Sequence, residues 1–180
     1  MGSQLDIAGS FILAGMMLLS FNMFIVDKQQ AELTSTNQVI RQEAMSSTTS
    51  LMMFDIRKAG YHCSGDKVLT ADPDDLKFAG DIDNNGSVDT VQYAFKKTVI
   101  TGGKNKMLLF RSVNGAATKG ADLDILSLQF SYLDKNGAST TVPGDVKTIQ
   151  ASIRFKQRVT NTIDTVNVRK MDFRITPKNL

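Results

Sequence analysis

The sequence predicts an α+β fold, in which one long N-terminal helix packs by its second half on an antiparallel β-sheet. Three observations support this prediction. Residues 7–26 carry no charge, residues 27–59 contain neither Pro nor Gly, and after Gly60 apolar and polar residues alternate between frequent turn residues. We therefore expect a hydrophobic helical segment over 1–27, an amphipathic continuation over 28–60 and a β-rich domain over 61–180.

The uncharged run comes first, and it lies between Asp6 and Asp27. A run of about 20 apolar residues is long enough to cross a hydrocarbon layer as a helix. No basic residue precedes it, and no small-x-small cleavage site follows it, as a signal peptide would require. We expect this segment to stay attached to the protein.

Small residues in this segment would let two helices approach closely; they are Gly9, Ser10, Ala14, Gly15 and Ser20. A helix of about 50 residues is roughly 75 Å long, which is more than a small β-rich domain can cover. Its first half must therefore be covered by lipid or by other copies. Two interpretations are open: a simple membrane anchor that lifts the domain off the bilayer, and a helix that packs against its own kind.

The second half of the helix shows apolar and small residues at helical spacing. One seven-residue series consists of Leu33, Ile40, Ser47 and Phe54, and a neighbouring series includes Ala44 and Leu51. Basic residues at 57–58 suit the negative end of the helix dipole, and Gly60 suits a left-handed cap. We expect Leu51 and Phe54 to be buried against the sheet.

The remaining sequence reads as successive strands without intervening helices, which predicts antiparallel pairing. Three rows are expected to face inward: Val91, Tyr93 and Phe95; Leu126, Leu128, Phe130 and Tyr132; Ile149, Ala151, Ile153 and Phe155. An Asn-Gly turn is expected at 134–137. In the last strand, residues 166–175, the apolar phase changes, which predicts a β-bulge near Lys170.

Composition and charge argue against several functions. The chain of 180 residues has a net charge of +3, one cysteine and one histidine. It therefore has no intramolecular disulfide, no cysteine-based or multi-histidine metal site, and little of the usual general-base chemistry, so we expect no enzymatic activity. The basic residues Lys104, Lys106, Arg154, Lys156 and Arg158 are interpreted as solvated, and we expect no nucleic-acid partner.

One stretch has the spacing of a calcium-binding loop. Residues 81–89 place oxygen-bearing side chains at loop positions one, three, five, seven and nine, with Gly86 at six: Asp81, Asp83, Asn85, Ser87 and Asp89. Position twelve is Gln92 instead of a bidentate Glu. Two interpretations stay open: a polar turn without an ion, and a weak calcium site, which would be the one cofactor of this chain.

The order of features resembles a type IV pilin or pseudopilin. The stretches that carry the resemblance are residues 54–61 at the helix end, then 76–93, 109–115 and 130–137, which look like the body of minor pilins. Such proteins have a basic leader and a Glu at the fifth mature position, and this sequence shows neither. We expect either that the sequence begins after processing or that assembly follows a different route.

The resemblance implies a structural subunit of an extracellular pilus-like filament, which polymerises with copies of itself through the N-terminal helix. The subunit would sit in the inner or plasma membrane before assembly and then in a filament at the cell surface, where it could serve adhesion. By resemblance, Asp6 would pair with the terminal amine of the next subunit; alternatively, Asp6 lies among lipid headgroups or caps the helix. Low-copy minor pilins and a monomeric membrane-anchored module are the alternative functions.

Overall fold

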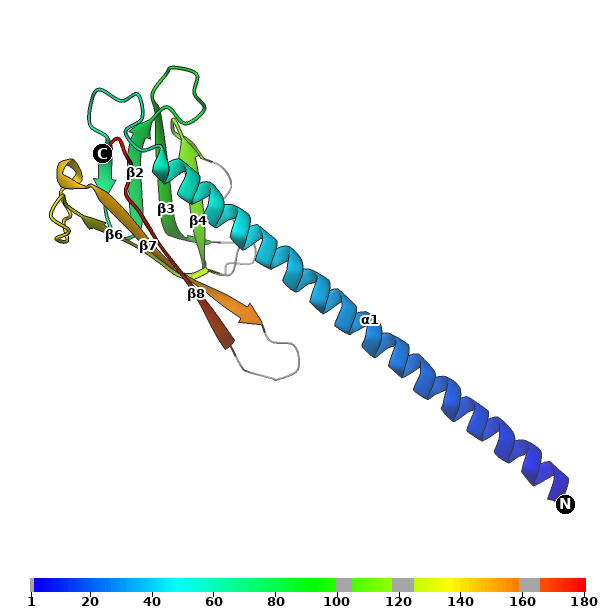
Figure 1. The fold of residues 1–180 in the computed structure, drawn as a ribbon. Coiled ribbons are helices and arrows are strands. Elements are labelled where there is room, and N and C mark those ends of the chain that lie inside the picture. Colours follow the sequence, from blue (N-terminus) through cyan, green and yellow to red (C-terminus); the bar gives the residue numbers. More distant parts are fainter. Residues whose placement is uncertain (1, 100–104, 118–124, 159–165) are drawn as a thin grey trace. The chain divides into compact units, whose positions relative to one another are not determined.

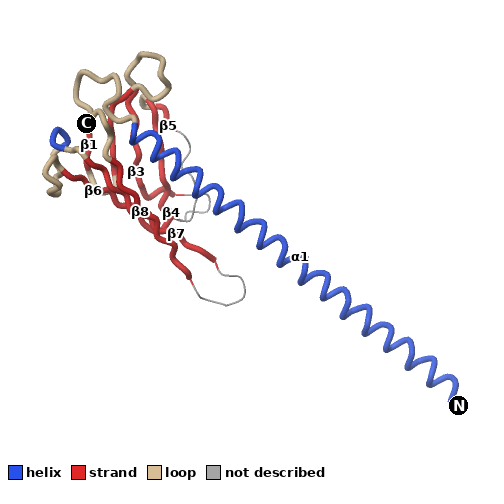
Figure 2. Tube along the Cα trace, viewed as in Figure 1, coloured by secondary structure: helices blue, strands red, loops and turns tan. Residues whose placement is uncertain are grey.

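The computed structural model describes residues 2–99, 105–117, 125–158 and 166–180 (Figures 1 and 2). A single helix, α1, covers Gly2–Arg57. The strands are β1 (Val68–Ala71), β2 (Asp75–Gly80), β3 (Asp89–Val99), β4 (Asn105–Val113), β5 (Ala116–Ala117), β6 (Ile125–Leu133), β7 (Thr148–Arg158) and β8 (Val166–Ile175), with a short 3-10 helix, η1 (Pro143–Asp145), before β7. Contacts divide the chain into two units, Met1–Glu43 and Ala44–Leu180.

The first unit is helical throughout its described residues. Its large apolar side chains between 11 and 26 are 36–78% exposed. Within the described part of the chain, α1 is the one helix that is long and apolar enough to cross a membrane, by length and composition.

The second unit contains two antiparallel sheets. Sheet A has the order β1-β2-β3-β4-β5, and sheet B has the order β6-β7-β8. Together with α1 they confirm the predicted α+β class, with two sheets where the alternating pattern suggested one. The turn at 134–137 forms as expected, but the chain then runs through η1 before it enters β7.

The core of the second unit lies between the end of α1 and the inner faces of both sheets. Met52 and Ile56 are fully buried in it. Leu51 and Phe54, by contrast, are 44% and 50% exposed, so the expectation that they face the sheet was wrong. Residues 52 and 56 share a helix face because they are four positions apart. Each residue is rotated by 100° around the helix axis, so residues 51 and 54 lie on other faces.

Two strand expectations also require correction. Leu126 is 46% exposed because the register shifts between Ile125 and Ser127, which brings Ile125 to the inner face instead. No bulge occurs in β8, whose pairing with β7 is continuous from Val166 to Ile175. The change of apolar phase arises because Val168 lies on the outer face, where it is half exposed. The buried rows from Val91 to Phe95 and from Ile149 to Phe155 are as predicted.

The end of α1 is held close to β2 by two glycines. Gly60 has a φ of +78° and donates its N–H to the carbonyl of Ala79 at 2.8 Å. A Cβ atom at Gly80 would lie 2.4 Å from the carbonyl oxygen of Lys58, so no larger residue fits there. This close approach brings the loop that follows β2 to the end of the helix.

Candidate functional site

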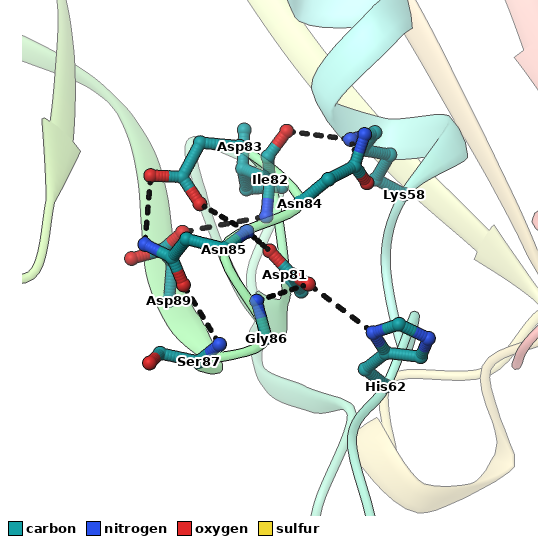
Figure 3. A network of polar contacts seen from close by, with 10 residues as sticks. All are labelled: Lys58, His62, Asp81, Ile82, Asp83, Asn84, Asn85, Gly86, Ser87 and Asp89. Atoms are coloured by element: carbon teal, nitrogen blue, oxygen red, sulfur yellow. Dashed lines mark hydrogen bonds and ion pairs between the residues drawn. The ribbon is translucent and has the colours of Figure 1, made fainter.

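The loop at 81–89 connects β2 to β3 and gathers most of the predicted site residues (Figure 3). It turns sharply at Asn84 and Gly86, whose φ angles are 62° and 85°. Asparagine and glycine adopt this left-handed region more readily than other residues. The local sequence therefore accounts for the shape of the loop.

Asp81 begins the loop, and the backbone of the loop turns around its side chain. Its side chain is buried, and it accepts hydrogen bonds from the backbone N–H of Asn85 and of Gly86, both at 3.1 Å. Burial by itself raises the pKa of this carboxyl, but the hydrogen bonds from Gly86, His62 and Asn85 outweigh it, so the pKa of Asp81 lies below its usual range. Asp81 therefore stays ionised at neutral pH.

Asp89 closes the loop at its other end. Its two oxygens accept the backbone N–H of Ile82 at 3.3 Å and the side-chain amide of Asn114 at 2.7 Å. Asn114 sits in the turn between β4 and β5 and also accepts the N–H of Thr90 at 2.8 Å. The sequence alone had not pointed to Asn114, although its place before Gly115 is typical of a turn.

The structure brings the three carboxylates of the predicted calcium loop together. One oxygen from each of Asp81, Asp83 and Asp89 lies within 4.8 Å of the others. Asn85 and Ser87 are both exposed: the Asn85 side chain donates to Asp83 at 2.9 Å and accepts the Ser87 N–H at 2.7 Å.

The twelfth position of the loop contributes nothing to this cluster. Gln92 donates its side-chain amide to both oxygens of Asp75 at 2.8 Å. A loop of this kind therefore lacks the ligand that normally completes a calcium site.

Two side chains, Lys58 and His62, face the loop from the segment that follows the end of the helix. Lys58 donates to the carbonyl of Ile82 at 2.6 Å and to the Asn84 side chain at 2.9 Å, and His62 Nδ1 lies 3.1 Å from Asp81 Oδ2. Figure 3 shows Lys58 and His62 approaching the loop at separate points. The loop is thus joined to the end of α1 by polar contacts.

Chemically, the loop is a turn that its own hydrogen bonds support, and it presents three clustered carboxylates. Hard oxygen donors suit Ca²⁺, and the oxygens of Asp83 and Asp89 accept one hydrogen bond each within the described residues, which leaves a lone pair on each. The same bonds hold the turn without an ion. Both interpretations of the sequence agree with this donor set.

The predicted assembly residues lie in the helical first unit. Asp6 is in α1, and its side chain is outside the described residues. Ala14 is exposed, and no atom lies within 4 Å of a Cβ placed at Gly9 or Gly15. Within the described residues, these two glycines therefore have space around the position of a Cβ atom.

A buried polar cluster that the sequence analysis missed ties α1 to sheet A. The Asp55 carboxylate is fully buried, and its Oδ2 accepts the Tyr93 hydroxyl at 2.6 Å and Arg111 Nε at 2.7 Å. Burial and the Asp55 charge raise the pKa of Tyr93, and the hydrogen bond to Asp55 raises the pKa of Arg111. An Asp in the apolar final turns of the helix is itself a signal that a buried partner is needed.

Comparison of the chain with protein-family models, with curated proteins and with solved structures found no match.

Proposed function

We propose that the chain is a structural subunit of an extracellular pilus-like filament, which assembles through its hydrophobic N-terminal helix. The observation that carries the proposal is the uncharged segment at 7–26, whose described large side chains are exposed along α1. A second unit that buries the end of the same helix would be displayed outside the assembled helices.

The apolar side chains of this segment must be removed from water by a partner. Burial of one large apolar side chain contributes about 1.5–3 kcal/mol, and a whole domain is stable by only about 5–15 kcal/mol. The exposed side chains, from Phe11 to Val26, would together cost more in water than such a domain gains by folding. Lipid would cover them before assembly, and neighbouring helices would cover them in a filament.

Asn22 is a polar residue inside the uncharged segment, and its side chain is compatible with an apolar environment. It donates its amide to the carbonyl of Leu18 at 2.9 Å. This bond within the helix reduces the cost of moving the side chain away from water.

The direct test is electron microscopy of material sheared from producing cells, with mass spectrometry of any fibre. Uniform fibres that consist mainly of this 19.7 kDa chain are expected. If the chain stays in the membrane fraction as a monomer and no fibre contains it, the filament proposal fails. Fibres in which the chain is a trace component would favour a low-copy minor pilin or pseudopilin.

The clustered carboxylates of loop 81–89 favour a second candidate, a membrane-anchored module that binds calcium. Calorimetric titration of the detergent-solubilised chain with calcium tests it. Saturable calcium binding that Asp83→Asn weakens would support this function. If no heat of binding is measured, the loop is a polar turn that binds no ion. Asp83 suits the test because it is exposed.

A further inference from the structure

The outer face of sheet B carries a concentration of positive charge. We call Arg154 and Lys156 on β7, with Lys170 and Arg174 on β8, the basic face. These positions alternate with the buried row of β7 and with the inward residues of β8. Beside them lies a hollow of about 300 Å³, lined by Ser131, Gln150, Ser152, Asp172 and Arg174.

The charges on the basic face are not balanced within the sheet. Arg154 and Lys170 stand directly opposite each other across the β7–β8 pair, an arrangement that repels and therefore destabilises the pairing. The one acid among them is Asp172, which pairs with Lys170 at 2.8 Å. Among the described residues, Lys156 and Arg174 have no ion-pair partner.

An exposed acidic turn belongs to sheet A and is hydrogen-bonded to the β6 edge of sheet B. Residues 72–75, which we call the acidic turn, join β1 to β2 and contain Asp72, Asp74 and Asp75. Asp72 and Asp74 are exposed, and their carboxylates have no hydrogen-bond or ion-pair partner among the residues that the structure describes. They are therefore free to bind a cation from outside.

The acidic turn is held rigidly. Phe130 N–H donates to the carbonyl of Pro73 at 2.7 Å, the Tyr132 hydroxyl donates to the carbonyl of Asp72 at 2.7 Å, and Phe95 N–H donates to the carbonyl of Asp74 at 2.9 Å. Backbone atoms make these contacts, so the carboxylates are presented in a fixed position without taking part in the turn's structure.

The two charged surfaces belong to different sheets. The acidic turn joins two strands of sheet A and is bonded to β6, one edge of sheet B, whereas the basic face lies on β7 and on the opposite edge strand, β8. A contact between two different surfaces of identical subunits is head-to-tail, and it can repeat without closing. A second copy of this chain therefore carries the acidic surface that the basic face could bind.

We propose that the basic face of one subunit binds the acidic turn of the next subunit in the filament. This inference rests on the proposed function and adds to it an electrostatic contact between the displayed β-rich units. Exposed ion pairs are weak singly and are screened by salt, so the contact would tune how tightly subunits associate.

Charge reversal in the full chain tests the contact, with assembly followed by sedimentation and electron microscopy after detergent removal. Asp72→Lys with Asp74→Lys, or Arg154→Glu with Arg174→Glu, should raise the protein concentration needed for assembly about fivefold. The chain that carries all four substitutions should assemble like wild type, because the charges are complementary again. Asp66→Lys with Asp145→Lys, at two other exposed acids, is the control with matched net charge and should assemble normally.

The outcomes separate this inference from the proposed function. If wild type forms no fibre, the filament function fails. If wild type assembles and both reversed pairs assemble equally well, or the fourfold variant does not recover, the contact is overturned and the filament stands. If only the basic-face variant loses assembly, the basic face binds a different acidic partner, and the proposed contact is overturned. Thermal unfolding of each variant shows that the β-rich unit remains folded.

Discussion

At the scale of single residues, two buried aspartates connect elements that are distant in the sequence. Asp81 holds loop 81–89 through backbone N–H groups, and Asp55 holds α1 on sheet A through Tyr93 and Arg111. The hydrogen bonds to Asp81 favour its ionised form, because charged acceptors form the stronger hydrogen bonds. Stability should therefore depend on both side chains, and on pH through Asp81.

Acidification should loosen loop 81–89 through Asp81. The pKa of Asp81 is depressed in the folded state, so the stabilisation is complete above the ordinary carboxyl pKa of about 3.9 and is lost as the pH falls through the lower folded value. Thermal unfolding midpoints of wild type and Asp81→Asn, measured between about pH 6 and about pH 2, should differ most at the upper end and converge at the lower. A constant difference across the range would show that the Asp81 charge is not responsible.

Removal of Asp55 should destabilise the β-rich unit more than removal of the Tyr93 hydroxyl. Asp55→Ala removes the buried carboxylate that accepts from both Tyr93 and Arg111 and breaks the ion pair, which costs about 3–5 kcal/mol. Tyr93→Phe leaves the ion pair in place and removes one hydrogen bond to a charged group, which costs about 1.5–3 kcal/mol. Urea unfolding followed by circular dichroism measures both, and an equal loss in the two variants would contradict the ranking.

At the scale of elements, the last turns of α1 have apolar residues on two faces. Met52 and Ile56 are buried in the core, whereas Leu51 and Phe54 are exposed on the other side. Lys58 lies 5.2 Å from the centre of the Phe54 ring and covers part of that face. The element is thus a core helix on one side and a solvent-facing helix on the other.

A matched pair of alanine variants should distinguish these two faces. Met52→Ala removes a fully buried side chain and should cost about 2–5 kcal/mol, because a cavity remains. Leu51→Ala, one residue earlier and nearly half exposed, should cost less than about 1 kcal/mol. Urea unfolding of the detergent-solubilised chain gives both values, and a larger loss at Leu51 would reverse the assignment of the buried face.

The buried and exposed faces of α1 also show how much of the fold the sequence predicts. The helix, its end near Gly60 and most strand rows follow from spacing, since periodicity reports which residues share a face. Periodicity cannot tell which of two apolar faces is buried, so Leu51 and Phe54 were assigned to the wrong side. The one-residue register shift that exposes Leu126 depends on pairing with β7, which the strand's own alternation does not contain.

The candidate site was predictable to a similar extent. The clustering of Asp81, Asp83 and Asp89 follows from loop spacing. The contacts of that loop with Lys58, His62 and Asn114 join segments far apart in the chain, and only the packing of α1 and β4 brings them there. Local sequence therefore predicts the turn, and tertiary structure supplies its hydrogen-bonding neighbours.

At the scale of the whole molecule, the chain combines a β-rich unit that covers its own core with a helical unit whose apolar surface is uncovered. No packing within the part of the chain that the structure describes requires Gly9 or Gly15 to be small, because a Cβ at either position would meet no neighbouring side chain within 4 Å. Glycine also lowers helix stability by about 1 kcal/mol relative to alanine. A contact with a neighbouring helix would explain why small residues stand there.

Gly15→Leu should therefore separate a packed filament from a simple membrane anchor. The substitution favours the helix, adds apolar surface for lipid and meets no obstacle within the chain, so folding and membrane association should be unchanged. Close packing of helices would be blocked, and fibres in sheared material should fall to a small fraction of the wild-type amount. Phe11→Leu, which keeps an exposed apolar side chain of smaller size, is the control and should assemble normally. Normal fibres from Gly15→Leu would exclude close helix contact at this position, and unchanged membrane retention without fibres from either protein would favour the anchor.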